Sequence, residues 1–231
     1  MQEKPVRGCD CVQARIIGVL AATPIDTGMG VDVVKTAGFP TVGRYLSANP
    51  EEQTQLQVLH PSALTELALG VCREMVLEGA RGVFLYCNSL AGAVDLDVIR
   101  RSLPVKVVTP LDVYETLAKR HRSIAVLAAN CQSLAAIEQT IKAVNPSCVV
   151  YGGGLLPLTE AVESGALPRE ITDKLEVGGF IRSLCKMGGE ILLLGCTHFP
   201  YLAEQITAVS DLPVIDPAEA MLLMLRESFI L

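Results

Sequence analysis

The sequence predicts an α/β protein of two pseudo-symmetric lobes, each a parallel sheet flanked by helices, with the functional site in the crevice between the lobes. Three observations lead to this prediction. Short apolar runs alternate with longer amphipathic stretches along the 231 residues, and a segment of the first half recurs in the second. Hydrophobic residues make up 50% of the chain but aromatic residues only 4%, so the core must be aliphatic, as suits buried parallel strands.

Seven short apolar runs are expected to form buried strands. They occupy residues 15–21, 82–86, 105–108, 124–128, 148–150, 191–194 and 214–215. The amphipathic stretches between them are expected to form helices. These occupy residues 61–78, 111–120, 131–144, 169–186 and 200–209. Strands and helices that alternate in this way favour a parallel, doubly wound sheet.

A last helix is expected directly after the final strand. Asp216 is expected as its N-cap, with Pro217 at the first helical position and Glu219 placed to complete a capping box. The first interpretation of Asp216 is therefore structural.

Other polar or glycine-rich positions also receive structural interpretations. The glycines at 152–154 follow a strand but lack the Lys and Ser/Thr of a phosphate loop, so a flexible turn is expected. His60 and His121 lie near helix ends, where capping or surface roles are expected. Arg44 and Tyr45 lie in a polar connection, which is either a solvated loop or a segment that folds over the crevice to grip a substrate carboxylate.

An internal repeat indicates two related halves. GVLAAT at residues 18–23 recurs as AVLAAN at 125–130, an offset of 107 residues. VFLYCNS at 83–89 resembles ILLLGCTH at 191–198. Each half thus starts with a similar strand and later has a strand that ends in a cysteine followed by small polar residues.

The matched cysteines are Cys87 and Cys196, which are 109 residues apart. The nearly equal offsets predict a first lobe of residues 1–108 plus 211–231 and a second lobe of residues 109–210. In open α/β sheets, ligands bind at the carboxyl ends of the strands. If the lobes face each other about a pseudo-twofold axis, Cys87 and Cys196 face each other across the crevice.

Two thiols on opposite sides of one substrate carbon supply what racemisation requires. One proton must leave the carbon on one face while another arrives from the opposite face. A strand end that feeds a helix N-terminus lowers the pKa of a thiol, so one cysteine is expected to act as base while the other stays protonated as acid. The pair therefore predicts a racemase of a small-molecule amino-acid substrate.

Polar side chains beside these strand ends are candidate substrate ligands. The α-proton of an amino acid is very weakly acidic, and the sequence has no clear motif for a pyridoxal or metal electron sink, so no cofactor and no metal are expected. Hydroxyl and amide donors must therefore stabilise the substrate carboxylate and the developing carbanion. His198, two residues after Cys196, is expected to tune that thiol. The candidate substrate-binding residues are Thr23, Asn88, Ser89, Asn130 and Thr197.

Two segments, YCNSLAGA at residues 86–93 and LLLGCTHFPYL at 192–202, resemble the two cysteine signatures of the aspartate/glutamate racemase superfamily. Weaker matches extend the resemblance over most of the chain. They are DTGMG at 26–30, PLTEAVESG at 157–165 and VIDPAEA at 214–220. The resemblance implies a two-lobed α/β fold, no cofactor, and Cys87 and Cys196 as the catalytic pair.

The same resemblance implies roles for further polar residues. His198 follows Cys-Thr as in the glutamate-racemase branch, whereas aspartate-preferring members tend to carry Glu there, so glutamate is favoured over aspartate. Asp26 is implied as a further catalytic residue, although LAATPI separates it from the first strand, as in the first loop of aspartate or broad-specificity members. The acidic residue expected after the Pro-Leu motif is either Glu160 or Glu163.

Composition argues against several classes of function. The net charge is −6, so the chain has no excess of basic residues that would bind a polyanion. Neither nucleic acid nor an anionic membrane surface is therefore an expected partner. The apolar runs are too short to span a bilayer and the amino end lacks a signal-peptide apolar region, so a cytoplasmic protein is expected. The eight cysteines are expected to be reduced thiols, with Cys9 and Cys11 in a polar tail rather than a zinc site. A homodimer is the expected assembly.

Other functions stay open at this stage. Within the same superfamily the alternatives are a hydantoin racemase and a maleate isomerase, whereas a decarboxylase would need only one of the two cysteines. A non-catalytic amino-acid sensor is a further alternative, although retention of both cysteines argues against it. In a third interpretation the cysteines form a redox switch, which requires them to lie within disulfide reach.

Overall fold

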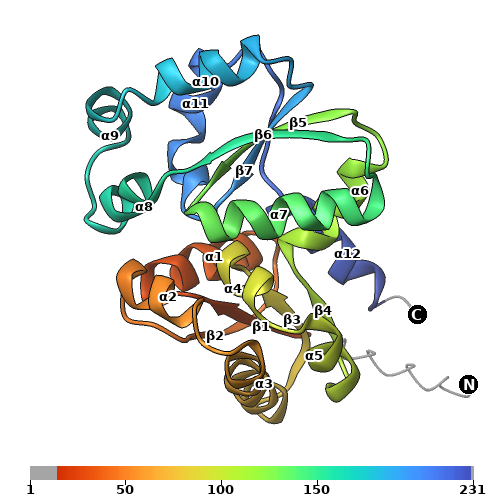
Figure 1. The fold of residues 1–231 in the computed structure, drawn as a ribbon. Helices are drawn as coiled ribbons and strands as arrows, with labels where there is room; N and C mark the ends of the chain where they lie inside the picture. The colour runs from red at the N-terminus through yellow and green to blue at the C-terminus, as the bar shows by residue number, and fades with distance from the viewer. Residues whose placement is uncertain (1–14, 230–231) are drawn as a thin grey trace, which may run out of the picture.

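A computed structural model describes residues 15–229 of the chain, and within them eight strands form two four-stranded sheets (Figure 1). Every strand pairing in both sheets is parallel. Helices flank each sheet, and each sheet forms the centre of one lobe. This arrangement confirms the predicted α/β class with two lobes.

The strand order is β2-β1-β3-β4 in the first sheet and β6-β5-β7-β8 in the second. The strands of the first sheet are β1 (Ile16–Ala21), β2 (Thr41–Tyr45), β3 (Ala80–Leu85) and β4 (Lys106–Val108). The strands of the second sheet are β5 (Ser123–Ala128), β6 (Val149–Gly154), β7 (Ile191–Gly195) and β8 (Val214–Ile215).

Helices connect the strands in both lobes. Those of the first half of the chain are α1 (Pro24–Thr36), α2 (Pro50–Leu56), α3 (Pro61–Leu77), α4 (Asn88–Ala93), α5 (Leu96–Ser102) and α6 (Pro110–Ala118). Those of the second half are α7 (Cys131–Val144), α8 (Leu156–Glu163), α9 (Pro168–Lys174), α10 (Val177–Lys186), the 3-10 helix η1 (Phe199–Leu202), α11 (Ala203–Val209) and α12 (Ala218–Glu227). Within residues 15–229, none of these helices combines the length and apolar character that crossing a membrane requires.

The central strands of each sheet are buried, which explains why they appear in the sequence as continuous aliphatic runs. In β5 (SIAVLA) every residue after the first is buried, and β7 (ILLLG) is buried throughout. The same holds for β1 apart from its first residue. Small and branched aliphatic side chains let the helices pack closely on these sheets.

The two sheets share one topology, because adding four to each strand number converts the first order into the second. The repeated segments GVLAAT and AVLAAN form most of β1 and β5 and the helix caps that follow. Thr23 Oγ1 accepts a hydrogen bond from the Asp26 N–H in the first turn of α1. Asn130 Oδ1 accepts one from the Ser133 N–H in the first turn of α7. The repeated unit is therefore a buried strand that ends in an N-cap.

Arg44 and Tyr45 lie on strand β2 rather than in a loop over the crevice. The Arg44 guanidinium forms an ion pair with Glu78, and Tyr45 is 54% exposed. Neither residue lines the pocket described below, so the interpretation of a carboxylate grip is wrong. β2 is an edge strand that pairs only with β1. It is not predicted because Gly43 and Arg44 interrupt the apolar run that indicates a buried strand.

The glycines at 152–154 lie in β6, so the expected flexible turn is wrong. A Cβ at Gly152 would lie 2.6 Å from the Val126 carbonyl oxygen. A Cβ at Gly154 would lie 2.5 Å from the backbone nitrogen of Cys131. Glycine is required here because β6 passes close to the backbone of β5 and of the α7 cap.

The stretch 169–186, predicted as one helix, forms two. α9 ends at Lys174, α10 begins at Val177, and between them Glu176 adopts a left-handed backbone with φ of 49°. Two glycines follow in the first turn of α10, and glycine has low helix propensity. The chain therefore turns at this point instead of continuing one helix.

The last helix begins one residue later than predicted. α12 starts at Ala218 rather than at Pro217, and the Asp216 carboxylate accepts a hydrogen bond from the Ala218 N–H at 2.9 Å. Asp216 thus stabilises the start of α12 as expected, but among the described residues Glu219 completes no capping box.

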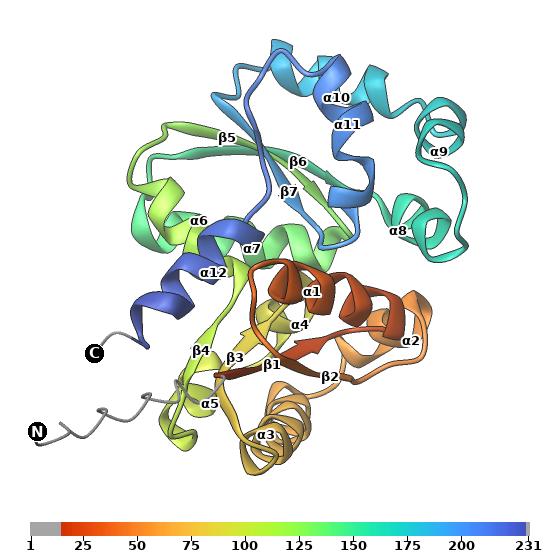
Figure 2. The ribbon, with the colours of Figure 1, turned by 180° about the vertical axis from the view of Figure 1, so that it is seen from behind.

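The carboxyl-terminal segment contacts both lobes. β8 pairs with β7 in the second sheet, whereas α12 packs against α6, β3 and β4 (Figure 2). The chain therefore returns to the first sheet after completing the second. The lobe boundaries placed at residues 108 and 210 stay predictions.

Candidate active site

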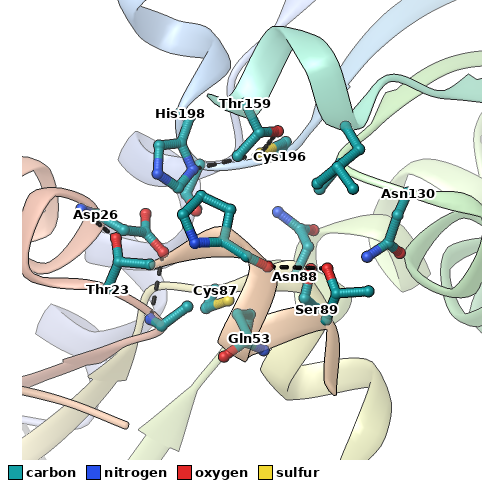
Figure 3. A pocket seen from close by; sticks show the side chains of 16 residues that line it. Thr23, Asp26, Gln53, Cys87, Asn88, Ser89, Asn130, Thr159, Cys196 and His198 are labelled. Atoms are coloured by element: carbon teal, nitrogen blue, oxygen red, sulfur yellow. Dashed lines mark hydrogen bonds between the residues drawn. The ribbon is translucent and has the colours of Figure 1, made fainter. Parts of the chain in front are cut away.

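The candidate site lies where the carboxyl ends of the central strands of both lobes meet. The strand ends open into one pocket. This is the edge at which parallel α/β sheets bind ligands. All nine site residues predicted from the sequence line it, and Figure 3 labels all of them except Thr197. Their chemical roles stay predictions. The nine residues are Thr23, Asp26, Cys87, Asn88, Ser89, Asn130, Cys196, Thr197 and His198.

Cys87 is the N-cap of α4 and is only 4% exposed. Its Sγ accepts a hydrogen bond from the Leu90 N–H at 3.4 Å. Burial raises the pKa of the Cys87 thiol well above its ordinary value, and the nearby Asp26 carboxylate raises it further. The backbone N–H groups of Ser89 and Leu90 at the helix N-terminus lower this pKa in the predicted direction, but the loss of thiolate hydration on burial outweighs them. Cys87 is a protonated thiol in this environment.

Cys196 follows β7 in the opposite lobe and is equally buried. Its Sγ lies 3.6 Å from Nδ1 of His198 and 3.7 Å from the Thr159 hydroxyl. Both neighbours can donate a hydrogen bond to a thiolate. The environment of Cys196 therefore differs from that of Cys87 in having a titratable donor beside the sulfur.

His198 connects Cys196 to Glu163. Its Nε2 donates to Glu163 Oε1 at 2.6 Å, and the Thr23 hydroxyl donates to the same carboxylate. Burial opposes the charged imidazolium, but the Asp26 carboxylate and the bonds to Cys196 and Glu163 raise the pKa of His198 to about 11. The same bonds from His198 and Thr23 outweigh burial and lower the pKa of Glu163. His198 and Glu163 form a buried ion pair, so of the two acidic candidates after the Pro-Leu motif it is Glu163 that contacts the site.

Asp26 lies in the first turn of α1 and is fully buried. Its Oδ2 accepts a hydrogen bond from the Ala22 N–H at 3.3 Å, whereas its Oδ1 has no partner among the described residues. Burial raises the pKa of Asp26, although the charge of His198 and the Thr197 hydroxyl oppose this effect. Asp26 thus presents a free carboxylate oxygen at the pocket despite the residues inserted after β1.

A chain of neutral groups lies on the other side of the pocket. Ser89 Oγ is 2.7 Å from Ser133 Oγ, and Asn130 Nδ2 donates to Gln57 Oε1 at 2.7 Å. These bonds link α4 and α2 of the first lobe to the start of α7 in the second. Ser89 occupies the place after Cys87 that His198 occupies after Cys196, so the repeat is symmetric in backbone but not in charge.

The described residues contain no group of three or more His, Cys, Asp or Glu side chains placed to hold a metal ion. Six of the eight cysteines lie within residues 15–229, and each of these is a free thiol. Cys9 and Cys11, interpreted as part of a polar tail, lie outside the described residues.

No protein-family model matches the chain. The sequence is 29% identical to the glutamate racemase of Roseiflexus sp. (strain RS-1) over 166 residues, which are 69% of this chain and 60% of that protein. It is 26% identical to the glutamate racemase of Limosilactobacillus reuteri (strain DSM 20016) over 160 residues, which are 67% of this chain and 59% of that protein. The chain therefore spans about 60% of the length of the curated relatives it matches.

Among solved structures, the glutamate racemase from Francisella tularensis subsp. tularensis SCHU S4 in complex with D-glutamate superposes with a TM-score of 0.65 at 16% identity, covering 94% of this chain and 83% of that one. The chain is similar to members of the aspartate/glutamate racemase superfamily. The two cysteine segments had indicated this resemblance, and the comparisons confirm it. At 16% identity the structural likeness establishes the shared fold of the superfamily and no further property.

Several residues of the site are missed by sequence reasoning. Gln53 and Thr54 of α2 reach the pocket, and α2 itself is not predicted. Asn49 followed by Pro50 is a helix-start signal that would have revealed it, since Asn49 caps α2 through the Glu52 N–H. Thr159 lies in the matched segment PLTEAVESG, but nothing there singles it out, and Tyr114 has no signal in the sequence. Only the packing of α8 and α6 brings these two residues to the site.

Proposed function

We propose that this chain is a cofactor-independent amino-acid racemase that interconverts the L and D forms of glutamate, with aspartate as the second substrate to test. The observation that carries the proposal is that Cys87 and Cys196 extend from matched strand ends of opposite lobes into one buried pocket. The names of the curated relatives and His198 after Cys-Thr favour glutamate over aspartate.

In the proposed reaction the two thiols exchange protons with opposite faces of the α-carbon. Cys196 acts first as thiolate, because the His198 imidazolium can donate to its sulfur, and Cys87 is the thiol because burial raises its pKa. The thiolate takes the α-proton on one face while the thiol gives its proton to the other face. The enzyme is left with the reversed protonation, which is the starting state for the opposite enantiomer.

The developing carbanion needs stabilisation that the pocket must provide. As the α-proton leaves, negative charge spreads onto the substrate carboxylate, and fixed hydrogen-bond donors stabilise this charge. Asn88, Ser89, Asn130 and Thr197 are the proposed donors. The unpartnered Oδ1 of Asp26 is the proposed acceptor for the substrate ammonium group.

The first test is incubation of the reduced protein, with a metal chelator, with each enantiomer of glutamate and aspartate in heavy water. We expect α-deuterium incorporation with inversion for glutamate, and at least about a 10³-fold loss in Cys87→Ser and Cys196→Ser, since each variant lacks one acid/base group. Cys185→Ser is the matched control, because Cys185 is a free thiol outside the pocket and its loss should leave the rate unchanged.

No exchange with any of the four enantiomers would overturn the proposal and bring hydantoins and maleate forward as substrates. Tight binding of glutamate without proton exchange would indicate the sensor instead. Loss of activity on mild oxidation with recovery on reduction, together with full activity in one cysteine variant, would indicate a redox switch.

A further inference from the structure

Tyr114 of α6 is fully buried and does not line the pocket, but it contacts Asn88, which does. Its hydroxyl lies 2.5 Å from Oδ1 of Asn88, the first residue of α4. At the other end of the same amide, Nδ2 of Asn88 is buried and has no partner among the described residues. A buried N–H without a partner costs free energy, so its presence in a pocket indicates that a ligand completes it.

The tyrosine hydroxyl determines which end of the Asn88 amide faces the pocket. The amide oxygen and nitrogen of an asparagine are distinguished by their hydrogen bonds. If Nδ2 donated to Tyr114, the hydroxyl proton would lose the only acceptor seen for it in residues 15–229. When Tyr114 donates to Oδ1, the hydroxyl is satisfied and both Nδ2 protons are available to the pocket. In Figure 3 the Asn88 amide lies among the lining side chains that include Cys87 and Cys196.

We propose that Tyr114 is a positioning residue, which through Oδ1 of Asn88 holds Nδ2 as a hydrogen-bond donor to the carboxylate of the substrate. The proposal rests on the racemase function proposed above. Burial raises the pKa of Tyr114 well above its ordinary value, so the hydroxyl stays protonated and remains a donor over the working pH range.

A fixed donor at this place matters more in the transition state than in the bound substrate. The carboxylate gains negative charge as the α-proton leaves, and a donor already oriented toward it needs no reorganisation. Without the tyrosine hydroxyl the amide can rotate and present its oxygen to that charge. Removal of the hydroxyl should therefore lower kcat more than it raises KM.

The kinetic test is a double-mutant cycle with Tyr114→Phe, Asn88→Ala and the double variant. We expect Tyr114→Phe to lower kcat/KM about 10-fold, as loss of one oriented hydrogen bond would, and to cause no further loss when Asn88 is already alanine. A purely structural role of Tyr114 would lower activity equally in both backgrounds, which would overturn the proposal. Tyr151→Phe on β6, outside the pocket, is the matched loss of a tyrosine hydroxyl and should leave kcat/KM unchanged.

A second measurement does not depend on turnover. The side-chain N–H signals of Asn88, assigned by their absence in Asn88→Ala, should shift and broaden in the NMR spectrum of Tyr114→Phe but not of Tyr151→Phe. Unchanged Asn88 signals in Tyr114→Phe would contradict the proposal whatever the kinetics show. If the wild-type protein racemises no amino acid, the racemase function fails, and the NMR result alone decides whether Tyr114 orients Asn88.

Discussion

At the level of single residues, the two cysteines have unlike neighbours although they occupy matching strand ends. Cys196 has the His198 imidazole beside its sulfur, whereas Ser89, at the matching place after Cys87, bonds to the neutral Ser133 hydroxyl. A positive charge therefore lies beside one sulfur and not beside the other. The different roles proposed for the two cysteines rest on this asymmetry.

The ion pair of His198 and Glu163 should make stability depend on pH. Since the pKa of His198 is raised from 6.5 to about 11, the imidazolium contributes stability that is complete below pH 6.5 and is lost as the pH rises toward about 11. We therefore expect the difference in unfolding free energy between the wild type and His198→Asn to shrink over this range. Urea unfolding at a series of pH values measures it.

Glu163→Gln serves as the control for this prediction. It removes the carboxylate bonded to His198 but leaves the histidine in place, so the alkaline loss of stability should become smaller without disappearing. A difference between wild type and His198→Asn that stays constant from pH 6.5 to 11 would show that His198 is not protonated in the folded protein.

At the level of secondary-structure elements, β6 depends on the close approach of its glycines to neighbouring backbone. A Cβ at Gly154 would lie 2.5 Å from the Cys131 nitrogen, and backbone at a helix cap cannot move aside. We expect Gly154→Ala to lower the unfolding free energy by about 1–3 kcal/mol through this overlap. Thermal and urea unfolding measure the change.

The matched substitution for Gly154→Ala is Gly70→Ala in α3. A Cβ at Gly70 meets no heavy atom within 4 Å, and alanine has the higher helix propensity, so this variant should be neutral or stabilised. If both variants were equally stable, the glycine run of β6 would not be explained by close packing.

At the level of the whole molecule, a ligand in the pocket contacts both lobes and should stabilise them together. A ligand that binds only the folded protein adds about 2.7 kcal/mol at 100 times its Kd. Glutamate should therefore raise Tm in a concentration-dependent manner, and the shift should be smaller in Asn88→Ala. Differential scanning fluorimetry against an amine without a carboxylate is the measurement, and an equal shift with both compounds would argue against the pocket as the binding site.

The homodimer expected from the sequence stays a prediction. The described chain does show how its own lobes are joined, since α12 packs against α6, β3 and β4 after β8 has completed the second sheet. Truncation before α12 would remove the fully buried side chains of Met221 and Leu225 and would expose the surfaces of α6, β3 and β4 against which α12 packs.

The sequence predicts the central strands well because each is a buried aliphatic run, and a buried parallel strand needs no alternation to be recognised. The edge strand β2, the helix α1 and the short helices α2, α4, α5 and α8 are not predicted. Partial exposure or a length of a few residues leaves too little periodicity in β2 and in the short helices, and α1 contains two glycines, which have low helix propensity. The predicted helix over residues 169–186 fails for a different reason, because a single residue in the left-handed region divides an otherwise helical stretch.

By itself, the sequence predicts the two-lobed α/β class and nine of the residues that line the pocket. Eight of them follow from an internal repeat that places matched strand ends at the same edge of each sheet, and Asp26 follows from the family resemblance. Only the tertiary structure decides the chemistry of those residues. Burial raises the pKa of Cys87, and Glu163, Thr159 and Tyr114 reach the site from elements distant in the sequence. Hydration and long-range contacts are properties of the packed molecule, and no local pattern of residues encodes them.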